Sequence, residues 1–441
     1  MNRARLEKIY AVLLLVIFGG VVLHAPLSVG LGTLFPDLLL VIKSWKEILM
    51  ILLIPLAVYL VTKRKLWSRL LNDWLFRLIL LFAALHFWLA TFIFVGATSV
   101  LAGLAIDLRY ILFFSLVYIL LLLRPDYRQW FVRIGIIGAF VVVGFATLQL
   151  FLPPDILAHI GYNTSTIAPY LTVDKNPDYI RVNSTLRGPN PLGAYAGMVL
   201  AFLTALLVNG KARLNNRKVL ISTLVLGSCG IVALWISYSR SALVGGAIMV
   251  LIVLFATWGR KLSRNAWVAL CVTTFALAGA LVALRGSSLV SNVIFHENLN
   301  GGSSVNSNEG HIMSLQYGAY IFLQHPFGLG VGSTGSASLL GDNPVTVENQ
   351  YLFTAHETGW LGLIIFMAIF VLIIRRSWQN RSDWLSLGVF ASGLGLALIG
   401  ILLPVWVDDT ISIVWWGLAA IVVAGGRHGS EQTKQKTART A

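Results

Sequence analysis

Long apolar stretches recur along the whole chain, and they constrain its fold more than any other feature. Runs of about 20 apolar residues, the length that crosses a lipid bilayer, alternate with shorter polar segments. Hydrophobic residues make up 57% of the 441 residues, charged residues only 12%, and the mean hydropathy is +0.80. A soluble domain of this length needs far less apolar surface. The sequence therefore predicts an all-α polytopic membrane protein.

The apolar pattern predicts about 12 transmembrane helices. Residues 1–30 superficially resemble a signal peptide, but no clear cleavage site follows the apolar core, so we interpret them as an uncleaved first helix. An even number of spans places both termini on the same side of the membrane. The expected spans are 9–25, 46–62, 74–95, 105–123, 131–151, 191–208, 219–237, 241–258, 266–284, 355–374, 384–403 and 411–425.

Positive charge gathers in alternate loops and predicts the orientation of the chain. Of the 33 lysines and arginines, 23 lie in the seven segments, termini included, that fall on one side of the membrane. Because such segments are usually cytoplasmic, we expect cytoplasmic N and C termini. The net charge of +15 then belongs to these loops, so we expect contacts with membrane lipids and no nucleic-acid partner.

The remaining segments divide the chain into regions. We expect one membrane domain, residues 1–428, followed by a disordered basic cytoplasmic tail, residues 429–441. Two long loops, about 152–190 and 285–350, fall on the extracytoplasmic side, and short interfacial helices are expected in both. The second of these loops is the longest in the chain. It ends in a cluster of polar residues just before the chain enters the next apolar span. We call this cluster the rim, and it is the predicted position of an extracytoplasmic active site.

Several kinds of chemistry have no sequence signature in this chain. The two cysteines, Cys229 and Cys271, both lie in apolar spans and lack the spacing of metal ligands or of a disulfide pair. No phosphate-binding loop, dinucleotide fingerprint, zinc signature or Asp-x-Asp metal pair occurs. We therefore expect no metal and no cofactor, and neither nucleotide-sugar nor ATP-driven chemistry.

Arginines on the predicted outer side are few and therefore informative. Arg240 lies in a turn with almost no loop between two spans, where it either binds a lipid-linked phosphate or reaches to lipid headgroups. Arg181 and Arg187 precede the sixth span, where Asn190 is expected to cap the helix, so they form an anion site or a solvated loop. Arg109 is expected at the start of the fourth span, as a substrate ligand or a plain interfacial anchor.

Glu348 is the candidate general base at the rim. A carboxylate there accepts the proton of an attacking hydroxyl, or else serves as a capping or structural acid. His356 is a rival base, but it is expected deeper along the same helix as a packing residue. Glu357 is expected to be structural.

Further polar residues are weaker candidates for substrate binding. Asp408 and Asp409 lie in a tight outer turn, where they orient an arginine, bind a sugar hydroxyl or are simply solvated. His311 is a further possible ligand, and Tyr351 either stacks on a sugar or belongs to the aromatic belt at the membrane surface.

Three motifs resemble the O-antigen ligase/polymerase superfamily of bacterial envelope glycosyltransferases. Arg187-Gly188-Pro189-Asn190-Pro191-Leu192-Gly193-Ala194-Tyr195 is the first, and Ser237-Tyr238-Ser239-Arg240-Ser241-Ala242 is the second. The third joins His325-Pro326-Phe327-Gly328-Leu329-Gly330-Val331-Gly332 to Glu348-Asn349-Gln350-Tyr351-Leu352 and then to Glu357-x-Gly359-x-x-Gly362. The similarity is strongest over residues 185–375.

The resemblance implies a GT-C-like fold and a metal-independent, inverting glycosyl transfer at the outer face of the bacterial cytoplasmic (inner) membrane. The donor would be an undecaprenyl-diphosphate-linked oligosaccharide, with Arg187 and Arg240 holding the diphosphate and Asp408 or Asp409 shaping the site. Ligases of this superfamily commonly have His-Asn where this chain has Glu348-Asn349. An acid there is more similar to the polymerases of O-antigen, capsule or exopolysaccharide.

The sequence therefore favours a polymerase, whose acceptor is another lipid-linked glycan. The alternative within the same class is an O-antigen ligase with lipid A-core or another acceptor. A transporter of lipid-linked glycan and a non-catalytic scaffold are the alternatives from other classes.

Overall fold

The computed structural model describes residues 2–173, 175–210, 215–259 and 307–440, with scattered residues between 263 and 291. Within these ranges, ten helices are long and apolar enough to cross a membrane, and Trp384–Ile399 is a shorter apolar helix. The expected span 266–284 lies largely outside the described residues. The all-α polytopic fold class is confirmed, whereas the count of twelve spans, the side of the termini and the GT-C likeness stay predictions.

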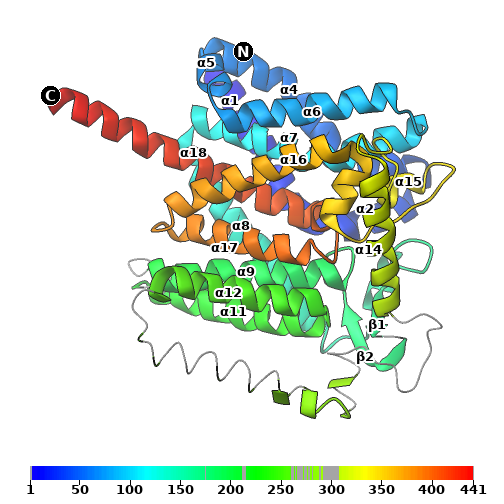
Figure 1. The fold of residues 1–441 in the computed structure, drawn as a ribbon. Coiled ribbons are helices and arrows are strands. Elements are labelled where there is room, and N and C mark those ends of the chain that lie inside the picture. The colour runs from blue at the N-terminus through cyan, green and yellow to red at the C-terminus, as the bar shows by residue number, and fades with distance from the viewer. Residues whose placement is uncertain are drawn as a thin grey trace.

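The described chain consists mainly of helices, and Figure 1 shows long rods together with several short helices and two β-strands. Their bounds are α1 Arg3–Gly20, α2 His24–Leu34, α3 Leu39–Lys43, α4 Trp45–Lys63, α5 Trp67–Leu71, α6 Trp74–Phe92, α7 Ala97–Leu123, α8 Arg128–Leu148, α9 Pro189–Asn209, α11 Arg217–Ile236, α12 Arg240–Trp258, α14 Ser307–Gln324, α15 Gly335–Ser338, α16 Gln350–Gln379, α17 Trp384–Ile399 and α18 Asp409–Thr440. Short 3-10 turns are η1 Val21–Leu23, η2 Pro36–Leu38, η3 Pro125–Tyr127, η4 Ile156–Ile160 and η7 Val405–Val407.

The core of the bundle forms around α18. Its membrane-spanning part, Asp409–Gly426, is 89% buried and packs mainly against α7, with α1, α8, α9, α16 and α17 around it. On the other side of α17, α9 packs against α11 and α12, and these three helices form a separate layer (Figure 1). The outer ends of α9, α12 and α17 therefore come together although they are far apart in sequence.

The first outer loop contains a β-hairpin, which the sequence did not predict. β1 (Tyr170–Val173) pairs antiparallel with β2 (Asn176–Val182), and Leu171 lies opposite Arg181. The interfacial helix expected in this loop is limited to the single 3-10 turn η4. The two strands are so short that their alternation of apolar and polar side chains cannot be distinguished from the sequence of a polar loop.

Two boundaries differ from the sequence prediction. α7 begins at Ala97, so Arg109 lies in the middle of a helix and not at its start. α18 continues to Thr440, so the tail is helical where a disordered segment was expected. Glutamine, lysine and arginine in the tail have good helix propensity and extend a helix that already exists.

The helix α16 is broken near its outer third. Gly359 has φ +67° and ψ −167°, which is far from helical geometry. The carbonyl oxygens of His356 and Glu357 accept hydrogen bonds from Leu329 N (2.7 Å) and Gly330 N (3.2 Å), and Trp360 N donates to Pro326 O (2.9 Å). The glycine-rich motif found in the sequence thus inserts into the break and satisfies its backbone groups, as irregular backbone at membrane depth requires.

Candidate active site

A crevice with a cavity of ≈550 Å³ opens between four helix ends and the β-hairpin. We call it the outer crevice, because the charge pattern predicts that this side is extracytoplasmic. Its lining combines two arginines, a histidine and small hydroxyl side chains with apolar residues. The lining residues are Arg181, Asn190, Tyr238, Ser239, Arg240, Ser241, Val244, Gly245, His311, Ile312, Leu315, Leu398, Ile399, Leu402 and Leu403. The structure thus brings together Arg181, Arg240 and His311, which lie in three separate regions of the sequence.

Arg181 is held at the crevice by two neighbouring segments. Its Nε donates to Ser237 O at 2.9 Å, and its Nη2 donates to Asn190 Oδ1 at 2.6 Å. The hairpin presents this side chain to the start of α9 and to the turn before α12. The expected helix cap at Asn190 is wrong, because α9 begins at Pro189 after Gly188 and the Asn190 amide binds Arg181 instead.

Arg240 is the first residue of α12, directly after a tight turn. Tyr238 has φ +45°, and Ser237 Oγ accepts from Ser239 N at 3.2 Å, so the turn is closed by its own side chains. Among the described residues, no side-chain hydrogen bond caps the first turn of α12. The positive end of the helix dipole and the guanidinium of Arg240 both attract negative charge to this end of the helix. Burial, together with nearby Tyr179, raises the pKa of Tyr238, whose phenol therefore stays a neutral donor.

His311 and Glu348 form a pair at the edge of the crevice. His311 Nδ1 lies 2.6 Å from Glu348 Oε2, although the contact is off the direction of an ideal hydrogen bond. Ser314 Oγ, one turn further along α14, accepts from Glu348 N at 2.8 Å and fixes the loop to this helix. The contact with His311 lowers the pKa of the Glu348 carboxyl. The Glu348 carboxylate is therefore a weaker base than that of an ordinary glutamate.

Asn349 and Tyr351 join the outer ends of α16 and α17. Asn349 caps α16, because its Oδ1 accepts from Tyr351 N and Leu352 N at 2.9 Å, and its Nδ2 donates to Ile401 O at 2.7 Å. The Tyr351 hydroxyl donates to Ala397 O at 2.6 Å. These contacts engage the side chains of both residues with the protein itself and give them a positioning role.

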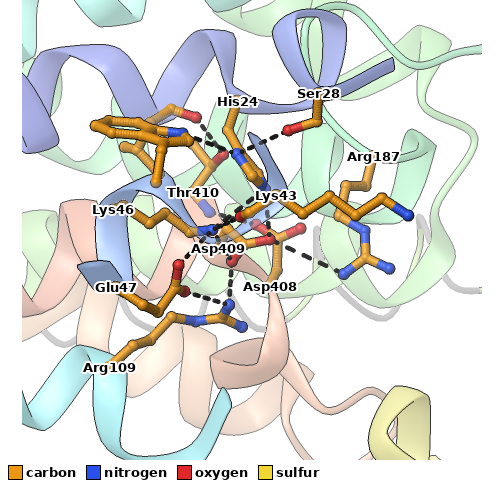
Figure 2. A network of polar contacts seen from close by, with 12 residues as sticks. His24, Ser28, Lys43, Lys46, Glu47, Arg109, Arg187, Asp408, Asp409 and Thr410 are labelled. Carbon is orange, nitrogen blue, oxygen red and sulfur yellow. Dashed lines mark hydrogen bonds and ion pairs between the residues drawn. The ribbon is translucent and has the colours of Figure 1, made fainter. Parts of the chain in front are cut away.

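A buried polar network lies beside the crevice, centred on Asp409 (Figure 2). Its carboxylate contacts Lys46 Nζ at 3.1 Å and His24 Nε2 at 3.5 Å, and it also binds the guanidinium of Arg109. Glu47 lies 3.2 Å from Lys46 and 3.5 Å from Arg109. Lys46 is only 2% exposed. Burial of so many charges is tolerated because each has partners of opposite sign.

Arg109 is not an interfacial anchor, contrary to one of the sequence interpretations. Its side chain is 5% exposed, and it binds Asp409 and the Val407 carbonyl. A substrate ligand was the other sequence interpretation of this residue, but the buried guanidinium binds Asp409 inside the bundle. Asp409 orients an arginine, which is one of the roles expected for it.

Arg187 and Asp408 lie at the margin of the network. Arg187 Nη1 is 4.0 Å from Asp409 Oδ2, its side chain is 45% exposed, and it does not line the outer crevice. Asp408 caps α18, since its Oδ1 accepts from Thr410 N and Ile411 N. Burial, followed by the charge of Asp409, raises the pKa of Asp408.

Sequence reasoning missed His24, Lys46 and Glu47 as members of a site. The available signal was the presence of ionisable side chains beside or inside apolar spans, which usually have defined partners. His356 is buried, with Nδ1 3.1 Å from Ser333 Oγ, in agreement with the predicted packing role.

Among the described residues, the fold has the ten long apolar helices expected of a multi-pass membrane protein. Residues 225–367 match the family described as O-antigen ligase, and this domain is consistent with the O-antigen ligase/polymerase superfamily that the motifs indicated. The matched segment contains Arg240, His311 and Glu348 but not Arg181 or Arg187. Members of this family are glycosyltransferase-like enzymes. No curated protein matches the chain significantly.

Proposed function

We propose that the protein polymerises undecaprenyl-diphosphate-linked oligosaccharide repeats into surface polysaccharide at the outer face of the cytoplasmic membrane. One observation carries the proposal: the lining of the outer crevice combines Arg181 and Arg240 with several leucines. A lipid-linked diphosphate glycan has the same division between an anionic head and an apolar chain. The O-antigen ligase family match over the same region supports this class of substrate.

The donor diphosphate lies between Arg181, Arg240 and the first amides of α12. Arginine forks suit phosphate oxygens because two parallel hydrogen bonds form at once. The same donors stabilise the negative charge that develops on the leaving diphosphate. Arg187, half exposed beside Asp409, adds positive charge at the margin of the site.

His311 is the group best placed to accept the proton. The His311 side chain lines the crevice, whereas Glu348 is not among the lining residues and its carboxyl has a lowered pKa. An imidazole oriented by a carboxylate is a recurring arrangement for general bases. The proposed role of Glu348 therefore changes from base, as inferred from sequence, to the residue that orients the base.

The proposed reaction is a single inverting displacement. A hydroxyl oxygen of the acceptor glycan bonds to the anomeric carbon of the donor, and its proton passes to His311. The bond from that carbon to the phosphate oxygen breaks, and undecaprenyl diphosphate leaves with the electron pair. Asp409 and Arg109 hold the protein framework next to the site, while Asn349, Tyr351 and Asp408 fix the helix ends around it.

The test uses purified protein in lipid with a short undecaprenyl-diphosphate-linked repeat as sole substrate. We expect a ladder of products on a gel, reduced at least about 100-fold in Arg240→Ala and about 10²–10⁴-fold in His311→Ala. Arg133→Ala, an exposed arginine at the predicted cytoplasmic end of α8, is the matched control and should retain the ladder. Thermal melting of each variant separates loss of activity from loss of fold.

The family description favours one second candidate, an O-antigen ligase. A single product that forms only after lipid A-core is added, with no ladder in its absence, would establish the ligase and reject the polymerase. Full activity of folded Arg240→Ala would reject the proposed diphosphate site. No product with either acceptor would favour a transporter of lipid-linked glycan.

A further inference from the structure

A second polar cavity lies inside the bundle, away from the outer crevice and from the Asp409 network. We call it the carboxyl cavity; it has room for about one water molecule (≈10 Å³). It lies between α6, α7, α16 and η7, beside the break in α16. Its ionisable lining residues are His86 on α6, Asp107 and Tyr110 on α7, and Glu357 on α16.

Two carboxylates meet in this cavity without a donor between them. Glu357 is 1% exposed, and its Oε1 accepts from Thr334 N at 3.3 Å, while its Oε2 has no hydrogen-bond partner among the described residues. Asp107 interacts directly with Glu357, and its Oδ2 is likewise buried and unpartnered within the described chain. Two ionised carboxylates offer only acceptors to one another, so the contact needs a proton.

The surroundings do not neutralise this charge. In the described chain, no lysine or arginine forms an ion pair with Asp107 or Glu357. Arg109, two residues from Asp107, binds Asp409 and Glu47 instead. A single water could fill the cavity and donate to both oxygens, but it would leave two negative charges buried in a membrane bundle. The burial of two unpaired charges in a membrane bundle is strongly destabilising.

Among the described residues, His86 is the other group beside the pair that can exchange a proton in the ordinary pH range. Its Nδ1 lies 2.8 Å from Phe82 O, and because a carbonyl only accepts, Nδ1 carries a hydrogen. Its Nε2 lies 3.8 Å from Asp107 Oδ2, too far for a direct hydrogen bond. No cluster of three metal ligands is found among the described residues, which argues for a proton over a metal ion at this position.

We propose that the carboxyl cavity is a proton-binding site, in which Asp107 and Glu357 share one proton and His86 is the neighbouring proton acceptor. The shared proton ties α7 to α16 just before the break at Gly359. Thr334 and the inserted loop contact the same glutamate, so the proton also stabilises the loop that leads toward Glu348. The proposal does not depend on the proposed function.

Infrared difference spectroscopy and thermal melting test the proposal on the full chain in lipid. We expect the wild type to show the carbonyl stretch of a neutral carboxylic acid at neutral pH, and both Glu357→Gln and Asp107→Asn to lose it. Asp126→Asn, which changes an exposed acid of the same type, should keep the band. Because the glutamine amide supplies a permanent donor, Glu357→Gln should also keep its melting temperature at alkaline pH while the wild type loses stability.

Three results would overturn the proposal. The first is a carboxylic-acid band that survives in both variants, because the proton would then lie elsewhere. The second is a wild type without the band whose pH-dependent melting disappears in His86→Gln, which would place the proton on the imidazole. The third is a stabilisation by NaCl over choline chloride, at equal ionic strength, that Glu357→Gln abolishes; this would assign a monovalent cation to the cavity.

Discussion

At the scale of single residues, the contact between His311 and Glu348 has the largest effect on the interpretation of the site. Sequence motifs assign importance to Glu348 because it follows the long outer loop and precedes α16. The structure shows that its carboxylate contacts a histidine contributed by another helix, at 2.6 Å. A carboxylate with a lowered pKa orients a base better than it acts as one. The two residues therefore form one ionic pair, to which we assign a single role in the proposed reaction.

Replacement of Glu348 by glutamine should change the pH dependence of stability. Because the folded-state pKa is lowered, the unfolded chain binds the proton more readily, and the carboxylate stabilises the fold above its ordinary pKa. We expect the wild type to melt at a higher temperature than Glu348→Gln at pH 7. This difference should begin to shrink as the pH falls below the ordinary glutamate pKa of about 4.3. It should vanish only below the lowered folded-state pKa, where the carboxyl is protonated in both states.

The measurement is a series of thermal melts of both proteins from neutral to acid pH. Asp126→Asn, again an exposed acid, shows how much any loss of surface charge contributes. A gap between wild type and Glu348→Gln that persists unchanged at the acid end would contradict the assigned contact.

At the scale of elements, the break in α16 explains a glycine-rich motif that sequence alone connects only with a family. Gly359 adopts φ +67°, and a Cβ on this residue would lie 2.3 Å from Pro326 O. A Cβ on Gly328 would lie 2.6 Å from Glu357 O. Both glycines are therefore required by close backbone approach between the loop and the helix. The motif builds the frame that places Glu357 in the carboxyl cavity and the Glu348 loop at the crevice.

Substitution of Gly359 by alanine should be strongly destabilising. The left-handed backbone alone costs about 1–3 kcal/mol for a residue with a side chain, and the clash with Pro326 adds to this. Gly144→Ala in α8 is a matched control, since no atom lies within 4 Å of its added Cβ and helix propensity favours alanine. Thermal melts in lipid should show a clear loss for the first variant and none for the second. Equal melting temperatures would mean that α16 tolerates a continuous helix at this position.

At the scale of the whole molecule, Asp409 connects segments from opposite ends of the chain. Its carboxylate contacts α2 through His24, α4 through Lys46 and α7 through Arg109, and Arg187 approaches it from the segment before α9 (Figure 2). The first residue of the central helix α18 is therefore fixed against the N-terminal part of the bundle. This network supports one wall of the outer face and does not itself line the crevice.

Asp409→Asn should destabilise the whole bundle, because among the described residues it leaves Glu47 as the remaining ion-pair partner of Lys46 and Arg109. Removal of one partner from a buried ion pair typically costs about 3–5 kcal/mol. The double variant Asp409→Asn with Lys46→Met should recover part of the loss, since it removes a buried positive charge as well. Asp126→Asn, which breaks only an exposed pair with Arg124, is the control and should change stability by less than about 1 kcal/mol. If Asp409→Asn left the stability of the protein unchanged, the charges of the network would be solvated and not buried.

Part of this structure could be predicted from local sequence patterns. Hydropathy over windows of about 20 residues locates the spans because the bilayer sets their length. Short motifs also identified Arg240, Arg181 and the Glu348 loop, since outer arginines and polar residues at helix starts are rare in such a composition. The hairpin, the helical tail and the start of α7 at Ala97 were missed, because short strands and helix boundaries leave weak local signals.

The sequence by itself determined the class of the protein: an apolar, all-α, polytopic membrane chain. Only the tertiary structure decided which charges meet. Arg109 binds Asp409 across 300 residues, and His311 finds Glu348 from a different helix. The physical reason is that hydropathy and periodicity are properties of a few turns, whereas an ion pair or an inserted loop depends on how distant helices pack. That packing placed Arg109 in the interior, Arg240 at the crevice and two carboxylates in one buried cavity.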